Sequence, residues 1–124
     1  MKIPGPDHPI TIAANPKRVR ARIEGHVIAD TAAALTLQEA SYPPVQYIPR
    51  EDAEMGFLAR TEKHTTCPYK GEASYYSIMI EGRLLENVVW SYEDPYPAMQ
   101  AIRRHLAFYP QVDVYELSDD AVNG

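Results

Sequence analysis

The chain has 124 residues, of which 45% are hydrophobic and 23% charged, and its formal net charge is −5 at pH 7. This length and composition predict one folded domain and exclude a disordered chain, which would need more charge and fewer aromatic residues. The negative charge argues against general binding of nucleic acid, and no stretch has the roughly 18–20 apolar residues that cross a bilayer. We therefore expect neither nucleic acid nor a membrane as a partner.

Prolines and glycines divide the chain into short segments, which is typical of a small β-rich domain with many turns. We expect residues 1–9 to form an extended lead-in, residues 10–118 a single β-rich domain, and residues 119–124 a frayed tail. The N-terminus lacks the apolar stretch of a signal peptide, and the single cysteine cannot form an internal disulfide. Both features predict a cytoplasmic location.

Strand patterns recur along the predicted domain. Residues 18–23 alternate between arginine and apolar residues, and Gly25 allows a turn into a second strand at residues 26–29. Further strands are predicted at residues 34–38, 45–48, 74–80, 84–92 and 112–117. The segments 74–80 and 84–92 are separated by a short turn and should form a hairpin.

One short helix is predicted near the C-terminus. Asp94 can cap its first turn, and apolar residues recur at helical spacing at Met99, Ile102 and Leu106. The predicted fold class is therefore mainly β: a small single-domain antiparallel sheet or barrel-like fold with one short C-terminal helix.

Arg18, Arg20 and Arg22 share one face of the first predicted strand. Cations at this spacing repel one another unless carboxylates, solvent or an anionic ligand compensate their charge. Solvation or surface pairing is the favoured interpretation, with partners among Glu24, Glu39, Glu51 and Asp52. Because the planar fork of arginine suits anions, Arg22 is kept as a candidate ligand-binding residue.

The best candidate for a functional surface is the segment 65–71, which reads Thr-Thr-Cys-Pro-Tyr-Lys-Gly. Pro68 fixes its own φ angle, and Gly71 permits a positive φ. We therefore expect a loop of fixed geometry. Its candidate ligand-binding side chains are Thr65, Cys67, Tyr69 and Lys70, because binding residues concentrate on loops held by a scaffold. The opposing interpretation is an ordinary turn beside a buried cysteine.

Cys67 also invites comparison with nucleophilic and metal sites. Lys63 and His64 would favour its thiolate, but a nucleophile needs a base and an orienting group that the sequence does not place. His64 and Cys67 have the spacing of half a zinc site, yet no second close pair of histidine or cysteine exists. No metal site is predicted, and the cofactor is unknown because no metal or nucleotide motif occurs.

An ordered set of motifs resembles one bacterial family. These are Thr-Cys-Pro-Tyr-Lys-Gly at 66–71, Tyr-Ile-Pro-Arg-Glu-Asp at 47–52, Trp-Ser-Tyr-Glu-Asp-Pro at 90–95 and Ala-Phe-Tyr at 107–109. Over residues 10–117 the chain resembles the family catalogued as domain of unknown function 427, sometimes labelled nucleotidyltransferase-like. The resemblance implies a small β-rich domain without an established activity.

The nucleotidyltransferase label can be weighed on chemistry. Metal-dependent transfer of a nucleotidyl group needs paired carboxylates for Mg²⁺ and a loop that holds phosphates. Asp52 and Glu54 are the only acidic pair at alternate positions, and no P-loop pattern occurs. The residues therefore give the label little support.

Two functions are consistent with these residues. The favoured one is binding of a small polar or anionic ligand, in a pocket that joins the 65–71 segment to Glu39, Tyr47, Arg50, Tyr75, Trp90 and Tyr92. Whether the protein is an enzyme is left open, and its catalytic candidates are Glu39, Cys67 and Lys70. The alternative is a protein-interaction or homo-oligomerisation module that uses the apolar strip at residues 42–47, with the aromatic residues packed in the core.

Overall fold

The computed structural model describes residues 1–118, which form ten strands and three short 3₁₀ helices. In chain order these are β1 (Ile10–Ala14), β2 (Val19–Ile23), β3 (His26–Thr31), β4 (Leu35–Glu39), β5 (Val45–Tyr47), η1 (Arg50–Asp52), η2 (Met55–Phe57), β6 (Leu58–Cys67), β7 (Gly71–Ile80), β8 (Arg83–Ser91), η3 (Pro97–Ile102), β9 (Ala107–Phe108) and β10 (Asp113–Glu116). The expected frayed tail at 119–124 lies outside the described residues.

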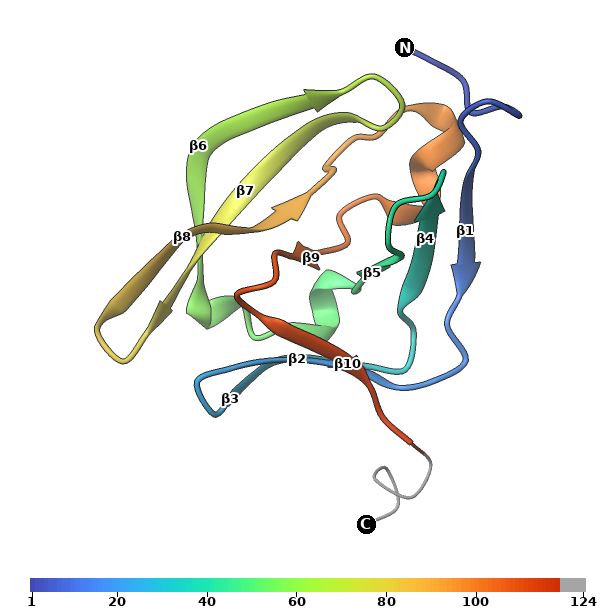
Figure 1. Cartoon of the computed structure of the whole chain (residues 1–124). Helices are drawn as coiled ribbons and strands as arrows, with labels where there is room; N and C mark the ends of the chain where they lie inside the picture. The colour runs from blue at the N-terminus through green and yellow to red at the C-terminus, as the bar shows by residue number, and fades with distance from the viewer. Residues whose placement is uncertain (119–124) are drawn as a thin grey trace.

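The strands form three antiparallel sheets, with the orders β1–β4–β5, β10–β2–β3 and β6–β7–β8–β9. Figure 1 shows them around one interior, with β1 and β4 on one side, the long β6–β7 ribbon on the other, and β2, β3 and β10 below. The predicted mainly β, antiparallel fold is confirmed. The barrel-like form is not, because the described strands belong to three sheets that do not close into one barrel.

The segment predicted to be a functional loop is instead a β-hairpin. β6 pairs with β7 from Leu58 opposite Ile78 to Cys67 opposite Gly71, so residues 68–70 alone form the turn. β6 lies at the edge of its sheet and most of its side chains are exposed. Its polar sequence therefore lacks the apolar alternation by which a half-buried strand is recognised.

The predicted short C-terminal helix corresponds only to the six-residue 3₁₀ helix η3. Its N-cap is Tyr96, without a side-chain capping bond, so Asp94 does not have the predicted capping role. The helix ends before Arg103, and Arg104 then takes a positive φ of 61°. Met99 and Ile102 are buried as expected, but one turn of 3₁₀ helix is enough to place them.

Buried side chains form two clusters on either side of the β6–β9 sheet. The first contains Ile28, Tyr76 and Ile78, and the second contains Tyr75 and Tyr92. Successive side chains of a strand point to opposite faces, so neighbours on β7 enter different clusters. This sheet therefore presents two distinct faces to the rest of the domain.

A single bridge between Ile48 and Leu106 connects the sheet that contains β5 to the sheet that contains β9. Their backbone groups exchange hydrogen bonds of 2.8 and 2.7 Å, and both residues are fully buried. The bridge holds Tyr47, the neighbour of Ile48 in the chain, close to Trp90. The indole Nε1 of Trp90 donates a 3.2 Å hydrogen bond to the Tyr47 hydroxyl.

The N-terminal residues lie against the turn of the β6–β7 hairpin. The amide of Lys2 donates a 2.7 Å hydrogen bond to the carbonyl of Pro68, and Gly5 and His8 form a local bridge. None of the helices in residues 1–118 is long and apolar enough to cross a membrane.

Candidate functional site

A buried ion pair joins the end of β4 to the β6–β7 turn. Lys70 Nζ lies 2.5 Å from Glu39 Oε1, and the two side chains are only 8% and 17% exposed. His8 Nε2 lies 2.7 Å from the second carboxylate oxygen, Oε2. The His8 ring in turn stacks on Tyr69 at 4.2 Å, so both oxygens of Glu39 are held by groups that are themselves fixed.

The surroundings of Glu39 favour its ionised form. Burial alone would raise the pKa of Glu39, but the hydrogen bonds and charges of Lys70 and His8 outweigh burial and bring the pKa below the ordinary value of 4.5. Glu39 is therefore a carboxylate at neutral pH and Lys70 has a permanent counter-charge.

This lowered pKa predicts an acid-dependent contribution to stability. The contribution of the pair is complete above pH 4.5, the value of an unperturbed glutamate, and is lost as the pH falls through the lower pKa of the folded state. Urea denaturation measured from pH 7 to pH 2 checks this against the double variant Lys70→Met, Glu39→Gln, which lacks the pair. We expect the curve of the native protein to fall more steeply below pH 4.5, whereas parallel curves would contradict the assignment.

A cavity of about 280 Å³ opens beside the ion pair. We call it the aromatic cavity, because besides Glu39 and Lys70 it is lined by Tyr42, Tyr47, Tyr75, Trp90, Tyr92 and Tyr109, with Leu37, Pro43 and Val45. Its residues come from two sheets, from the β6–β7 turn and from the segments that follow β4, β8 and β9.

The alternation of β7 and β8 builds one wall of this cavity. Tyr75 and Trp90 are directly opposite in the register of the two strands, and Tyr92 follows Trp90 on the same face. Hydrogen bonds hold the rings in place, since the Tyr75 hydroxyl lies 2.8 Å from Thr65 Oγ1. The rings of Trp90 and Tyr109 are also in contact, with centroids 4.8 Å apart.

Three phenol groups of the cavity, those of Tyr47, Tyr92 and Tyr109, are protonated at neutral pH. Burial raises the pKa of Tyr47 and of Tyr92 well above the ordinary value of 10. Burial and the neighbouring Tyr75 raise the pKa of Tyr109 to about 12. These hydroxyls are therefore neutral groups that can donate as well as accept hydrogen bonds.

Six of the eleven candidate ligand-binding residues line the aromatic cavity: Glu39, Tyr47, Lys70, Tyr75, Trp90 and Tyr92. Five further lining residues were not candidates from the sequence: Leu37, Tyr42, Pro43, Val45 and Tyr109. Tyr42 and Pro43 belong to the apolar strip at residues 42–47, which was interpreted as a contact surface. Tyr109 belongs to the Ala-Phe-Tyr motif at 107–109, and this motif was the signal that could have identified it.

The other five candidates lie outside the cavity: Arg22, Arg50, Thr65, Cys67 and Tyr69. Residues of the hairpin turn point in different directions, because Tyr69 stacks on His8 while Lys70 turns inward. Cys67 packs beside the second core cluster, with its Sγ 3.8 Å from Lys70 Nζ.

The three arginines of the first predicted strand, of which Arg18 precedes β2 and Arg20 and Arg22 lie within it, separate into two environments. Arg18 and Arg20 both pair with Asp30, at 2.6 and 3.2 Å, and Asp30 lies opposite Arg20 on β3. The expected partners Glu24, Glu39, Glu51 and Asp52 do not pair with them. Arg22 follows a β-bulge and lines a separate groove together with Arg83 and residues 110–114.

Neither pair of residues considered for a metal forms a cluster of ligands. His64 pairs with the exposed Glu72 at 3.4 Å, and Asp52 accepts a 2.7 Å hydrogen bond from Thr31. Within residues 1–118, no three histidine, cysteine, aspartate or glutamate side chains lie close enough together to hold a metal ion.

Comparison with known proteins agrees with the resemblance in the motifs. A family model described as Domain of unknown function (DUF427) matches residues 11–118, which include every residue that lines the aromatic cavity. None of the curated proteins compared with the chain matches it. The chain therefore belongs to the family described as Domain of unknown function (DUF427).

Proposed function

We propose that the protein binds a small polar molecule with a planar ring in the aromatic cavity. The observation that carries this proposal is the buried Glu39–Lys70 pair at an aromatic-lined cavity of about 280 Å³. Ligand sites are typically concave and mostly apolar, with a few fixed polar groups that orient the ligand. The aromatic walls offer stacking surfaces, and the ion pair offers the orienting groups.

The charges of the pair favour a ligand without net charge. The carboxylate of Glu39 compensates the ammonium of Lys70, so an anion would gain little net attraction there. Lys70 Nζ has three protons, of which Glu39 and Cys67 accept two among the described contacts. A ligand with an adjacent acceptor and donor, such as the amide edge of a heterocycle, fits the ammonium and the carboxylate together.

Binding is favoured over acid–base catalysis at this pair. A general base works best when its pKa lies near the working pH, and the pKa of Glu39 is lowered from an already acidic value. Lys70 Nζ is held in a tight ion pair with Glu39 and its side chain is only 8% exposed, which restricts its use as a nucleophile. Their geometry suits them to orient a bound molecule.

A fragment screen tests this proposal. Trp90 is the only tryptophan in the chain, so its fluorescence reports on the cavity wall alone. We expect planar amide-containing heterocycles to raise the melting temperature and to change Trp90 emission. In the double variant Lys70→Met, Glu39→Gln their affinity should fall by tenfold or more, since hydrogen bonds to charged groups contribute about 1.5–3 kcal/mol.

The matched control is Leu84→Ala, which removes an exposed side chain that does not line the cavity and should leave fragment binding unchanged. A screen in which no fragment alters melting or Trp90 emission contradicts the proposal. So does a fragment that binds the native protein and the double variant equally.

The alternative of an interaction module has less support. The strip at residues 42–47 is not a continuous exposed surface, because Tyr47 is buried and Tyr42 and Pro43 border the aromatic cavity.

Cys67 is a free thiol, which supports our proposal of a cytoplasmic location.

A further inference from the structure

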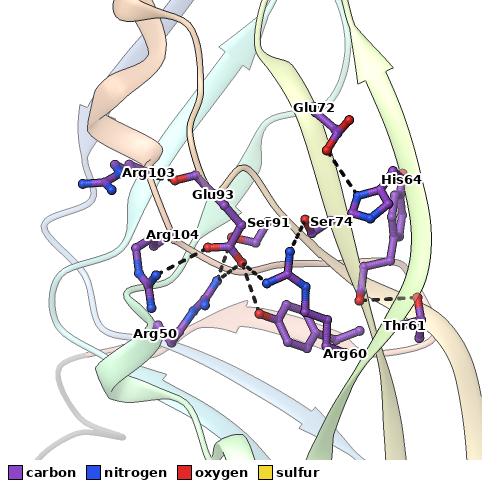
Figure 2. Close-up of polar contacts among 12 residues, drawn as sticks. Arg50, Arg60, Thr61, His64, Glu72, Ser74, Ser91, Glu93, Arg103 and Arg104 are labelled. Carbon is purple, nitrogen blue, oxygen red and sulfur yellow. Dashed lines mark hydrogen bonds and ion pairs between the residues drawn. The ribbon is translucent and has the colours of Figure 1, made fainter.

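A second polar cluster lies on the opposite face of the β6–β9 sheet from the aromatic cavity. Ser91 and Glu93 alternate along the chain with Trp90 and Tyr92, so their side chains leave the other face of the strand. Figure 2 shows guanidinium groups directed at the Glu93 carboxylate from separate parts of the chain. The sheet thus separates this cluster from the aromatic residues.

Glu93 is shared by three arginines. Arg50, the first residue of η1, donates hydrogen bonds of 2.8 Å to Glu93 and 3.0 Å to Ser91, whereas Arg60 and Arg104 each lie 3.8 Å from the carboxylate. Burial alone would raise the pKa of Glu93, but the hydrogen bond and charge of Arg50 outweigh it and lower the pKa. The carboxylate is therefore ionised and contributes one negative charge to the cluster.

Positive charge exceeds negative charge at this cluster. Arg103 adds a fourth guanidinium, whose Nε donates a 3.2 Å hydrogen bond to the backbone carbonyl of Glu93. Among the residues that contact Glu93 or line the groove beside it, four arginines and two carboxylates, Glu93 and Glu51, leave an excess of two positive charges. This excess is notable in a chain whose formal net charge is −5.

Two atoms of the cluster have unused hydrogen-bonding capacity. Arg50 Nε and Glu93 Oε2 are buried, and neither has a hydrogen-bond partner among the described residues. Only Arg50 Nε is a donor that a bound anion can accept from, because Glu93 Oε2 is an acceptor, which the Arg104 guanidinium approaches to 3.8 Å. The Arg50 side chain is only 17% exposed, so it cannot turn freely to water. Buried polar groups are nearly always satisfied in native proteins, by water or by a bound group where the protein supplies no partner.

A groove of about 590 Å³ runs beside these residues, and we call it the arginine groove. It lies between the η1–η2 segment and the turn after η3, and its lining includes Arg50, Arg103, Arg104, His105 and Glu51. Arg103 and Arg104 are largely exposed, so their guanidinium groups are accessible to a ligand from solvent.

We propose that the arginine groove binds the phosphate group of a small molecule. A phosphate monoester has a charge of roughly −1.5 to −2 near neutral pH, which matches the excess of two positive charges better than a carboxylate does. Its oxygens can accept paired hydrogen bonds from the planar forks of several arginines. This site is separate from the aromatic cavity, and the proposal holds whether or not that cavity binds a ligand.

The test titrates inorganic phosphate and, separately, ribose 5-phosphate into the ¹⁵N-labelled protein at constant ionic strength, with sodium chloride as reference. We expect both phosphates to shift amide signals of residues 50–55 and 103–105. A double variant, Arg103→Gln with Arg104→Gln, should weaken binding by tenfold or more while the fold is retained, because both side chains are exposed. The matched control Arg83→Gln, at an arginine of the separate groove, should bind as the native protein does.

Tighter binding of ribose 5-phosphate than of inorganic phosphate would support an esterified ligand, and equal binding would support free phosphate. The proposal is overturned if phosphate has no more effect than chloride. It is equally overturned if the Arg103, Arg104 double variant binds phosphate as tightly as the native protein.

Discussion

Replacing Lys70 with methionine is expected to lower the free energy of unfolding by about 3 kcal/mol. The substitution keeps the apolar length of the side chain but leaves the half-buried carboxylate of Glu39 without its closest counter-charge. Removing one partner of a buried ion pair costs about 3–5 kcal/mol, because the desolvated charge of the other partner remains. Urea denaturation at pH 7 measures the loss.

A second substitution, Glu39→Gln, also removes the carboxylate charge that Lys70→Met leaves without its counter-charge. Lys70→Met combined with Glu39→Gln should recover most of the stability, to within about 1–2 kcal/mol of the native protein, because replacing both partners of a buried pair is often nearly neutral. If the single and double variants are equally stable, the Glu39–Lys70 pair does not act as described.

Leu106→Ala is expected to cost about 2–5 kcal/mol, the range of Leu→Ala substitutions in cores. Leu106 is fully buried, and its backbone forms the bridge to Ile48 that connects two of the sheets. The loss should appear as a lower denaturation midpoint with an unchanged slope. Both walls of the aromatic cavity depend on this connection, since Tyr47 is the last residue of β5 and Trp90 on β8 pairs with Ala107 of β9.

Leu84→Ala is the matched control for this loss. Leu84 is 52% exposed on the β7–β8 hairpin, so the same chemical change should alter stability by no more than about 0.5 kcal/mol. Comparable losses in the two variants would contradict the central position of Leu106.

Strong local patterns made much of the fold predictable. The strands at 74–80 and 84–92 were evident because both are apolar and lie one tight turn apart, as β7 and β8 do. β6 was missed because an edge strand with exposed side chains has no apolar alternation. The predicted helix was too long, because it included Leu106. Met99 and Ile102 lie in the 3₁₀ helix η3, whereas Leu106 follows it and forms the bridge to Ile48.

The aromatic cavity was predictable in part. Lys70 and Glu39 were both candidate ligand-binding residues, and the structure brings them together across 31 positions of the chain. Arg50 was assigned to the same pocket, yet it lies on the other face of the sheet with Glu93. Tertiary contacts decide which face a side chain reaches after a turn at Pro49, and sequence alone does not supply them.

The arginine groove had a signal in the sequence that was overlooked. Period-two alternation in residues 90–93 places Trp90 and Tyr92 on one face and Ser91 and Glu93 on the other. A predicted strand with an aromatic face and a polar face indicates two different environments. The alternation of residues 90–93 therefore predicts that Glu93 lies on the opposite face of the strand from Trp90 and Tyr92.

The most direct test of the aromatic cavity as a binding site is the indole N–H signal of Trp90 in a ¹⁵N–¹H NMR spectrum. The chain has one tryptophan, so this signal is unique, and its proton is hydrogen-bonded to the Tyr47 hydroxyl inside the cavity. Titration with a planar amide-containing fragment from the screen should move the signal saturably, together with the backbone amide of Lys70. If the fragment binds and both signals stay in place, the ligand site lies elsewhere and the account of this cavity is wrong.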